Sequence, residues 1–267
     1  GPLTKEQVKN LMSSSISVPT LALNYTDSSS LPTNLYQFGL APQDEAVQLA
    51  DKARQAGRTR ALIIATQSDW GQKVVKTLSA RWKTDGGSVQ DVLYVTPKSN
   101  LTQDIASLLH VTAPKEGMNT VSAQDKSALQ QSMRDQRRKD FDVVFLLTTP
   151  ETARTVVPLL KFYYVDNTPL YAISSVYTGN RSPQKDMDLN GVIFCDTPWT
   201  ILGSQTGAHA SRLYAVGRDS YLLSRDLPRL EVLPSFPIYG STGALSLTSD
   251  HQIFRRLPWT TIRNGQP

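Results

Sequence analysis

The sequence predicts an α/β protein in which parallel sheets are flanked by helices on both faces. Short runs rich in Val, Ile, Leu and Phe alternate along the chain with longer segments of helical periodicity, the order typical of this class. The apolar runs are bounded by turn residues. At 267 residues and 39% hydrophobic composition, the chain can bury the core of one large domain or of two moderate ones.

Six apolar runs are predicted as strands because each is short and ends at turn or polar residues. In chain order they are 18–24, 60–66, 91–97, 142–148, 169–177 and 191–199. Their apolar residues are continuous rather than alternating with polar ones, which is typical of strands buried on both faces of a parallel sheet.

Helices are predicted between these strands from periodicity and end signals. Segment 43–57 has acidic residues in its first turn and a glycine at its end. Segment 69–87 places Val74, Leu78 and Trp82 on one face and ends at two glycines. Both segments are therefore expected to pack an apolar face on the sheet.

Three further helical predictions cover the second half of the chain. Segment 150–165 begins at a proline, which suits the first turn of a helix. Segment 98–122 is ambiguous and rich in loop residues, and Ser122 with Asp125 resembles a capping box for a helix ending near residue 139. The helix 211–227 is expected to bury a face formed by Leu213, Val216, Tyr221 and Leu223.

The closing segment 236–266 is predicted as a β-hairpin. Gly240 and Gly243 permit tight backbone geometry, and the turn LTSDHQI joins two alternating runs. His251 lies at the tip and is expected to be a turn residue. The side chains expected to point inward are Leu257, Trp259 and Ile262.

Sequence motifs give no support for catalysis or for a metal site. The chain has no G-x-S-x-G elbow, no P-loop and no G-x-G-x-x-G. His110, His209 and His251 lie in separate segments without ligand spacing, which argues against zinc. Cys195 is the only cysteine and ends an apolar strand, so a buried, inert thiol is expected. We therefore predict no enzyme activity, no catalytic residue, no metal and no cofactor.

The charge distribution argues against a nucleic-acid partner. The 28 basic and 23 acidic residues give a net charge of +5, spread along the chain rather than clustered. The one local basic run, 133–140, is interpreted as a solvated helix end rather than a phosphate-binding patch. The sequence contains no signal peptide and no apolar run near 18 residues.

Polar residues at the carboxyl ends of the predicted strands mark a candidate binding edge, because ligands of such folds lie there. These residues are mostly hydroxyls, amides and aromatics, which suit binding better than chemistry. Trp70 either stacks on a ligand or packs on a neighbouring lobe, and Asn24 either bonds a ligand or shapes a turn. Asp69 and Asp196 both end strands, and for Asp69 a cap of the following helix is favoured.

An ordered set of segments resembles a known family. The segments are LALN, YQFGLAPQDEA, DWGQKV, SARW, GVIFCDTPW, RLYAVGRDSYLL, GSTGALSL, RRLPW and NGQ. Together they resemble the C-terminal domain of the LpoA family, lipoprotein activators of class A penicillin-binding proteins in the outer membrane. The likeness covers nearly the whole chain and is weakest over 98–139. More broadly, the chain looks like the two-lobed type I periplasmic binding fold.

The resemblance implies how the lobes are divided. Residues 1–41 and 199–240 would form the first lobe, and residues 42–198 and 241–267 the second, with three crossings at APQDEA, CDTPW and the closing hairpin. The family's first lobe opens with a βαβαβ unit that precedes the GPL motif, so this lobe is expected to be incomplete at its N-terminal side. Residues 3–11 fit the helix that follows, whereas the initial GP is either native or the remnant of a protease site. The missing strands are either supplied from elsewhere or removed.

The resemblance also implies function. It points to a non-catalytic periplasmic regulator of peptidoglycan synthesis that binds a class A penicillin-binding protein and activates its transpeptidase. A lipid anchor upstream of this chain would hold it at the inner leaflet of the outer membrane. The alternative is a periplasmic protein of transport or sensing that binds a small, amino-acid-like molecule, although no acidic partner for an amine is evident. The implied residues of the interlobe cleft are Asn24, Thr26, Ser68, Trp70, Thr148, Ser175 and Tyr177.

Overall fold

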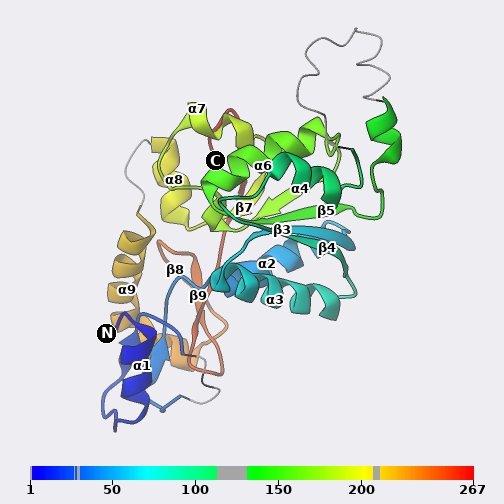
Figure 1. The fold of residues 1–267 in the computed structure, drawn as a ribbon. Coiled ribbons are helices and arrows are strands. Elements are labelled where there is room, and N and C mark those ends of the chain that lie inside the picture. Colours follow the sequence, from blue (N-terminus) through cyan, green and yellow to red (C-terminus); the bar gives the residue numbers. More distant parts are fainter. Residues whose placement is uncertain (1, 27, 29–30, 113–130, 207–210) are drawn as a thin grey trace.

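The computed structural model describes residues 2–26, 28, 31–112, 131–206 and 211–267. Figure 1 shows a larger body that holds a six-stranded sheet and a smaller body below it that holds two small sheets, with one long helix running from the larger body to the smaller. The α/β class with a mostly parallel sheet between helices, predicted from the alternation of elements, is confirmed.

The large sheet has the strand order β11-β7-β6-β5-β3-β4. Its strands are β3 (Arg60–Thr66), β4 (Ser88–Val95), β5 (Val143–Leu147), β6 (Leu170–Ala172), β7 (Ile193–Cys195) and β11 (Trp259–Thr261). Every neighbouring pair is parallel except β11 with β7, which is antiparallel. The five parallel strands all overlap the predicted apolar runs.

Helices cover both faces of this sheet (Figure 1). On one face α2 (Pro42–Gln55) and α3 (Asp69–Thr84) pack against side chains such as Ile63. On the other face α4 (Leu101–Leu108) and α6 (Pro150–Phe162) pack against Leu62 and Ile64. Successive residues of β3 thus feed opposite cores, as the two-residue period of a strand requires. The helix α4, capped by Asn100, was missed in the segment interpreted as loop-rich.

Short helical elements complete the larger body. They are the 3₁₀ turns η2 (Ser174–Val176) and η3 (Met187–Leu189) and the helices α7 (Pro183–Asp186) and α8 (Pro198–Thr206). The turn η2 directly follows the strand β6 and lies beside the end of β5. None of the helices in the described part of the chain is both long enough and apolar enough to cross a membrane.

The smaller body combines one parallel and one antiparallel sheet. Its elements are α1 (Lys5–Met12), β1 (Thr20–Ala22), β2 (Leu35–Gln37), α9 (Arg212–Val232), β8 (Ile238–Tyr239), β9 (Ala244–Leu247) and β10 (Ile253–Arg256). Thr4 and Gln7 form a capping box at the start of α1, so the predicted helix over residues 3–11 is confirmed with shifted ends. Phe38, Leu223 and Leu245 lie in the core of this body.

The closing segment is divided between the two bodies. The sequence prediction groups residues 241–267 with the second lobe. In the structure β9 pairs with both β8 and β10 and this sheet packs on Tyr36 and Phe38, whereas β11 joins the large sheet. The division of the chain into lobes remains a prediction. The hairpin itself is present, with His251 at positive φ in its turn and stacked on Tyr36. Of the three side chains expected inward, Leu257 and Ile262 are buried and Trp259 is half-buried.

The buried face of α9 differs from the prediction. Val216 and Leu223 are buried as expected, but Leu213 and Tyr221 are 76% and 69% exposed. The inward stripe continues through Leu227, at the helical spacing from Leu223, so Tyr221 falls off this stripe. Leu213 precedes the part of the helix that covers the core.

Two predictions concern the region around residues 113–140. The proposed capping box of Ser122 and Asp125 lies outside the described residues, and residues 131–136 are helical. The basic run 133–140 is not simply a solvated helix end, because Arg138 is largely buried and pairs with carboxylates at 2.7 and 3.3 Å. The positive charge of Arg138 is therefore compensated by ion pairs within the fold.

Candidate functional site

The chain passes between the two bodies three times: from β2 to α2, along α9, and from β10 to β11 (Figure 1). Each passage contributes at least one charged side chain to the interior. Glu45 belongs to α2, Arg212 begins α9, and Arg255 precedes the last passage, while Asp196 follows β7. We call these four residues the passage network. Each carboxylate in it is buried.

Arg212 ties the start of α9 to the larger body. Its guanidinium donates two hydrogen bonds to the carboxylate of Asp196, with N–O distances of 2.5 and 2.8 Å. It also donates to the backbone oxygens of Ser174 and Tyr177 at 3.0 and 2.9 Å. This paired geometry is strong and directional. Burial raises the pKa of Asp196, and its hydrogen bonds to Arg212 oppose that rise.

Glu45 and Arg255 link the first passage with the third. The carboxylate of Glu45 accepts hydrogen bonds from the backbone N–H and the hydroxyl of Ser174 at 2.9 and 3.1 Å. The guanidinium of Arg255, which is fully buried, lies 3.8 Å from this carboxylate and donates to the oxygen of Thr242 at 3.4 Å. Burial raises the pKa of Glu45, and the positive charge of Arg255 opposes that rise.

Two further side chains hold the chain on either side of Arg255. The amide of Gln48 donates to the Arg255 oxygen and accepts from the Leu257 N–H, both at 2.9 Å. The carboxylate of Asp219 accepts from the N–H groups of Ser241 and Thr242 at 2.7 and 2.6 Å. Side chains of α2 and α9 thus fix the backbone of the segment that returns to the large sheet.

A cleft of about 1040 Å³ lies between the two bodies. It is lined from both sides, and its charged side chains have both signs: Lys5, Asp44, Asp69 and Lys73. Burial raises the pKa of Asp44, whereas the positive charge of Arg255 lowers it. The cleft is thus mostly apolar, and its few charged side chains offer donors and acceptors to a small molecule.

Three of the seven predicted residues line this cleft: Asn24, Thr26 and Trp70. The amide of Asn24 donates to the Leu3 oxygen at 2.9 Å and accepts from the next backbone N–H, so it also shapes the turn. Trp70 is half-buried and packs partly on the core beneath α3. Whether these residues bind a ligand remains a prediction.

The other four predicted residues do not line the cleft. Ser68 accepts a hydrogen bond from the Gly71 N–H at 3.0 Å and is the N-cap of α3, so the cap predicted at Asp69 was wrong by one residue. Thr148 and Tyr177 are buried, and Ser175 donates from its hydroxyl to the Thr148 oxygen at 2.9 Å. The turn η2 folds over the end of β5 and keeps these side chains inside.

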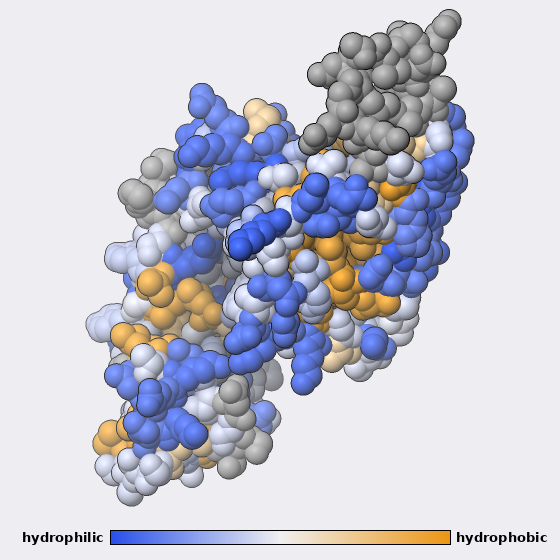
Figure 2. All heavy atoms as spheres, in the orientation of Figure 1, coloured by the Kyte–Doolittle hydropathy of each residue, from blue (hydrophilic) through white to orange (hydrophobic). Residues whose placement is uncertain are grey.

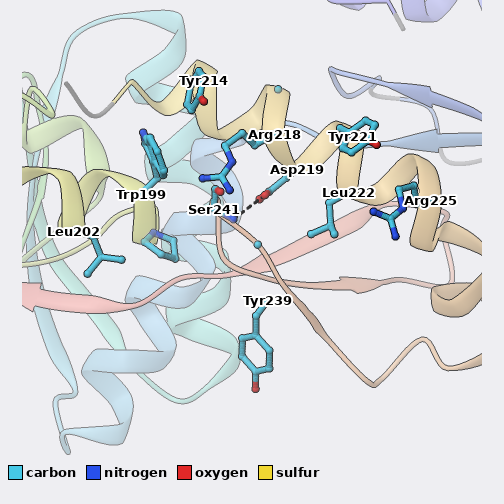
Figure 3. A pocket seen from close by; sticks show the side chains of 13 residues that line it. Trp199, Leu202, Tyr214, Arg218, Asp219, Tyr221, Leu222, Arg225, Tyr239 and Ser241 are labelled. Carbon is cyan, nitrogen blue, oxygen red and sulfur yellow. Dashed lines mark hydrogen bonds between the residues drawn. The ribbon is translucent and has the colours of Figure 1, made fainter. Parts of the chain in front are cut away.

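A second cavity, which sequence reasoning missed, is a groove of about 880 Å³ between α8, α9 and β8 (Figure 3). The rings of Trp199 and Tyr214 lie 5.2 Å apart, and the guanidinium of Arg218 lies 5.0 Å from the Trp199 ring. The signal was in the sequence: Tyr214, Arg218, Tyr221 and Arg225 recur at the spacing of one helix face. We assigned Tyr221 to the inward face instead.

The groups considered for catalysis are placed as follows. Cys195 is buried, as predicted, and burial raises the pKa of its thiol, which disfavours the nucleophilic thiolate. His209 lies outside the described residues. Within the described ranges, no three His, Cys, Asp or Glu side chains are grouped as a metal site would need.

A model of the LppC lipoprotein family matches residues 1–265. The penicillin-binding protein activator LpoA of Vibrio vulnificus (strain YJ016) is 26% identical over 277 residues, which cover 97% of this chain and 46% of that protein. The chain spans about half the length of the curated relatives it matches.

Solved structures show the same fold. The C-domain of LpoA from Haemophilus influenzae, described as a regulator of PBP1A, matches with a TM-score of 0.74 and 24% identity, over 100% of this chain and 79% of that one. A Chromobacterium violaceum protein assigned to branched-chain amino acid ABC transport matches with a TM-score of 0.70 and 25% identity, over 98% and 79% of the two chains. The two-lobed periplasmic binding fold expected from the sequence is thus confirmed.

Proposed function

The chain belongs to the LppC lipoprotein family, and we propose that it is a non-catalytic regulator that binds a class A penicillin-binding protein and favours its transpeptidase activity. The observation that supports this most is the family match over residues 1–265 together with relatives named as penicillin-binding protein activators. We further propose that the protein acts in the periplasm and is held at the inner leaflet of the outer membrane by a lipid anchor.

The passage network supports a binding role because its charges are used to hold the two bodies together. Arg212 and Asp196 satisfy each other, and Glu45 is bonded to Ser174. An activator must bind the active state of its partner more tightly than the inactive state. A protein whose two bodies keep a fixed angle can do this by contacting two parts of the synthase at once.

The test is to measure binding and activity with purified components. We expect the full-length protein to bind a class A synthase from the same organism saturably by surface plasmon resonance and to raise the fraction of cross-linked peptides. A monofunctional transpeptidase serves as the control partner. The proposal is abandoned if no class A synthase from that organism is bound.

The cleft supports a second candidate function, the binding of a small amino-acid-like molecule. Trp70 lines it beside side chains of both charge signs. We expect such a ligand to raise the melting temperature of the protein, since it binds only the native state. A thermal-shift screen of amino acids and cell-wall fragments measures this, and Trp70→Ala should remove the shift while leaving synthase binding intact. A screen without any shift contradicts the cleft function and leaves the leading proposal untouched.

A further inference from the structure

The groove between α8, α9 and β8 exposes several large apolar side chains. Figure 2 shows hydrophobic side chains on the flank of the molecule where these elements lie. Tyr239 of β8 is 83% exposed, and Leu202, Tyr214 and Tyr221 are exposed as well. Exposed apolar side chains that gather in one groove and are rimmed by polar residues are typical of an interaction site.

The side-chain types in the groove are those that dominate the energetics of protein interfaces. Trp, Tyr and Arg are the residue types most enriched among interface positions of large energetic effect. Here Tyr214 and Arg218 both pack against the ring of Trp199, Tyr214 with its ring tilted by 38°, and this contact reduces the side-chain entropy lost on binding. The groove thus offers a preorganised aromatic cluster rather than isolated exposed rings.

The charge of the groove is positive. Arg218 and Arg225 line it, and neither forms an ion pair within the described part of the chain. Asp219 also lines the groove, but its carboxylate is buried and accepts hydrogen bonds from the backbone N–H groups of Ser241 and Thr242. A partner that complements this surface must therefore bring carboxylates.

The spacing of the two arginines defines the occupant further. Figure 3 shows Arg218 reaching from α9 toward Trp199, and Arg225 farther along the helix beyond Leu222. Seven residues of helix separate their backbones by about 10 Å. In an extended β segment, side chains four residues apart lie on the same face and about 13 Å apart, a span that long arginine side chains can reach from backbones about 10 Å apart, and the side chain midway between them on that face can be apolar. The strand β8 has β9 as its only partner in its described sheet, which leaves an edge for such a segment.

We propose that this groove is the surface that docks the synthase, and that it takes an extended segment of that partner carrying two acidic side chains four residues apart, with an aromatic or aliphatic side chain midway between them on the same face. The proposal rests on the proposed function and specifies the surface and the chemistry of its partner. It places the contact on α9, the helix that joins the two bodies.

The experiment compares variants of the full-length protein for binding to the purified class A synthase at low and moderate salt. Arg218→Glu combined with Arg225→Glu should lower the affinity at least about tenfold and flatten its salt dependence. Tyr239→Ser should also weaken binding. The matched control is Arg229→Glu, an exposed arginine on the same helix that does not line the groove, which should bind like the unmodified protein.

The possible outcomes distinguish a failure of the docking proposal from a failure of the proposed function. If the unmodified protein binds and the double variant binds equally well, the docking surface is wrong. If the unmodified protein does not bind any class A synthase, the proposed function itself fails. Two other results also overturn the docking proposal: a change only in self-association by sedimentation, which indicates a second copy as occupant, or protection of the groove by the rest of the full-length chain in hydrogen exchange. Circular dichroism and melting temperature confirm that each variant is folded.

Discussion

Arg255→Met is expected to lower the free energy of unfolding by about 3–5 kcal/mol at neutral pH, the usual cost of removing one partner from a buried ion pair. Arg255 is fully buried, and its positive charge opposes the rise in pKa of the Glu45, Asp44 and Asp196 carboxyls. Without it, these carboxylates keep only Arg212 as a nearby cation in the passage network. Methionine fills similar space, so the loss reports the charge rather than a cavity.

The loss in free energy of unfolding caused by Arg255→Met should become smaller as the pH is lowered. Removing Arg255 raises the pKa of Glu45 and Asp44 further above their unfolded values. A carboxyl whose folded pKa is raised binds its proton more tightly in the folded state, so its stabilising effect is present below the unfolded pKa and is lost as the pH rises through the folded pKa. The difference between variant and unmodified protein is therefore largest near pH 7 and smaller near pH 5. Asp140 and Asp142, whose pKa values are lowered, affect both proteins equally.

Urea denaturation at both pH values measures this effect. The matched control is Arg256→Met, because Arg256 is the next residue along β10 and is exposed. We expect the control to change the stability by less than about 0.5 kcal/mol. Equal losses at the two positions, or a loss at Arg255 that does not depend on pH, would contradict the role given to its charge.

Gly71→Ala is expected to destabilise the fold by about 3 kcal/mol, because it forces an atom into a closely packed contact. A Cβ at Gly71 would lie 2.0 Å from the backbone oxygen of Thr66, and this oxygen belongs to β3 and is not free to move. The start of α3 would have to shift away from the sheet. The hydrogen bond from the Gly71 N–H to Ser68 would be strained as well.

Gly217→Ala is the control for this change. Gly217 also lies in a helix, but a Cβ there meets nothing within 4 Å, so the substitution should stabilise the protein by up to about 1 kcal/mol through helix propensity. Chemical denaturation of both variants gives the two free energies. A Gly71→Ala variant that loses no more stability than Gly217→Ala would show that close packing at α3 is not the cause.

How much of the fold the sequence predicts depends on whether a signal is local. The strand β3 was predicted at its observed bounds, because its apolar run is continuous and ends at turn residues. The strand β2 was missed, since it has three residues, one of them Gln37, and is defined by its pairing with β1. The helix α4 was also missed, although Asn100 caps it, because it has only eight residues.

The same distinction applies to the site. Asn24, Thr26 and Trp70 were found because they follow strands that end at the cleft. The pair of Glu45 and Arg255 could not be predicted, since the two residues are far apart in sequence and meet only after the whole fold has closed. For the groove, helical spacing alone could not decide whether Tyr221 points inward, because its exposure depends on where the core ends.

The link between β10 and β11 has a mechanical consequence. Only Leu257 and Pro258 separate the last strand of the smaller body from the edge strand of the large sheet. The ring of Pro258 fixes its φ angle, and Gln48 holds the N–H of Leu257, so this link has few free rotations. It therefore behaves as a stiff coupling. A torque applied to the smaller body is transmitted to β11 and, through its pairing with β7, into the sheet, instead of being absorbed by a slack connection.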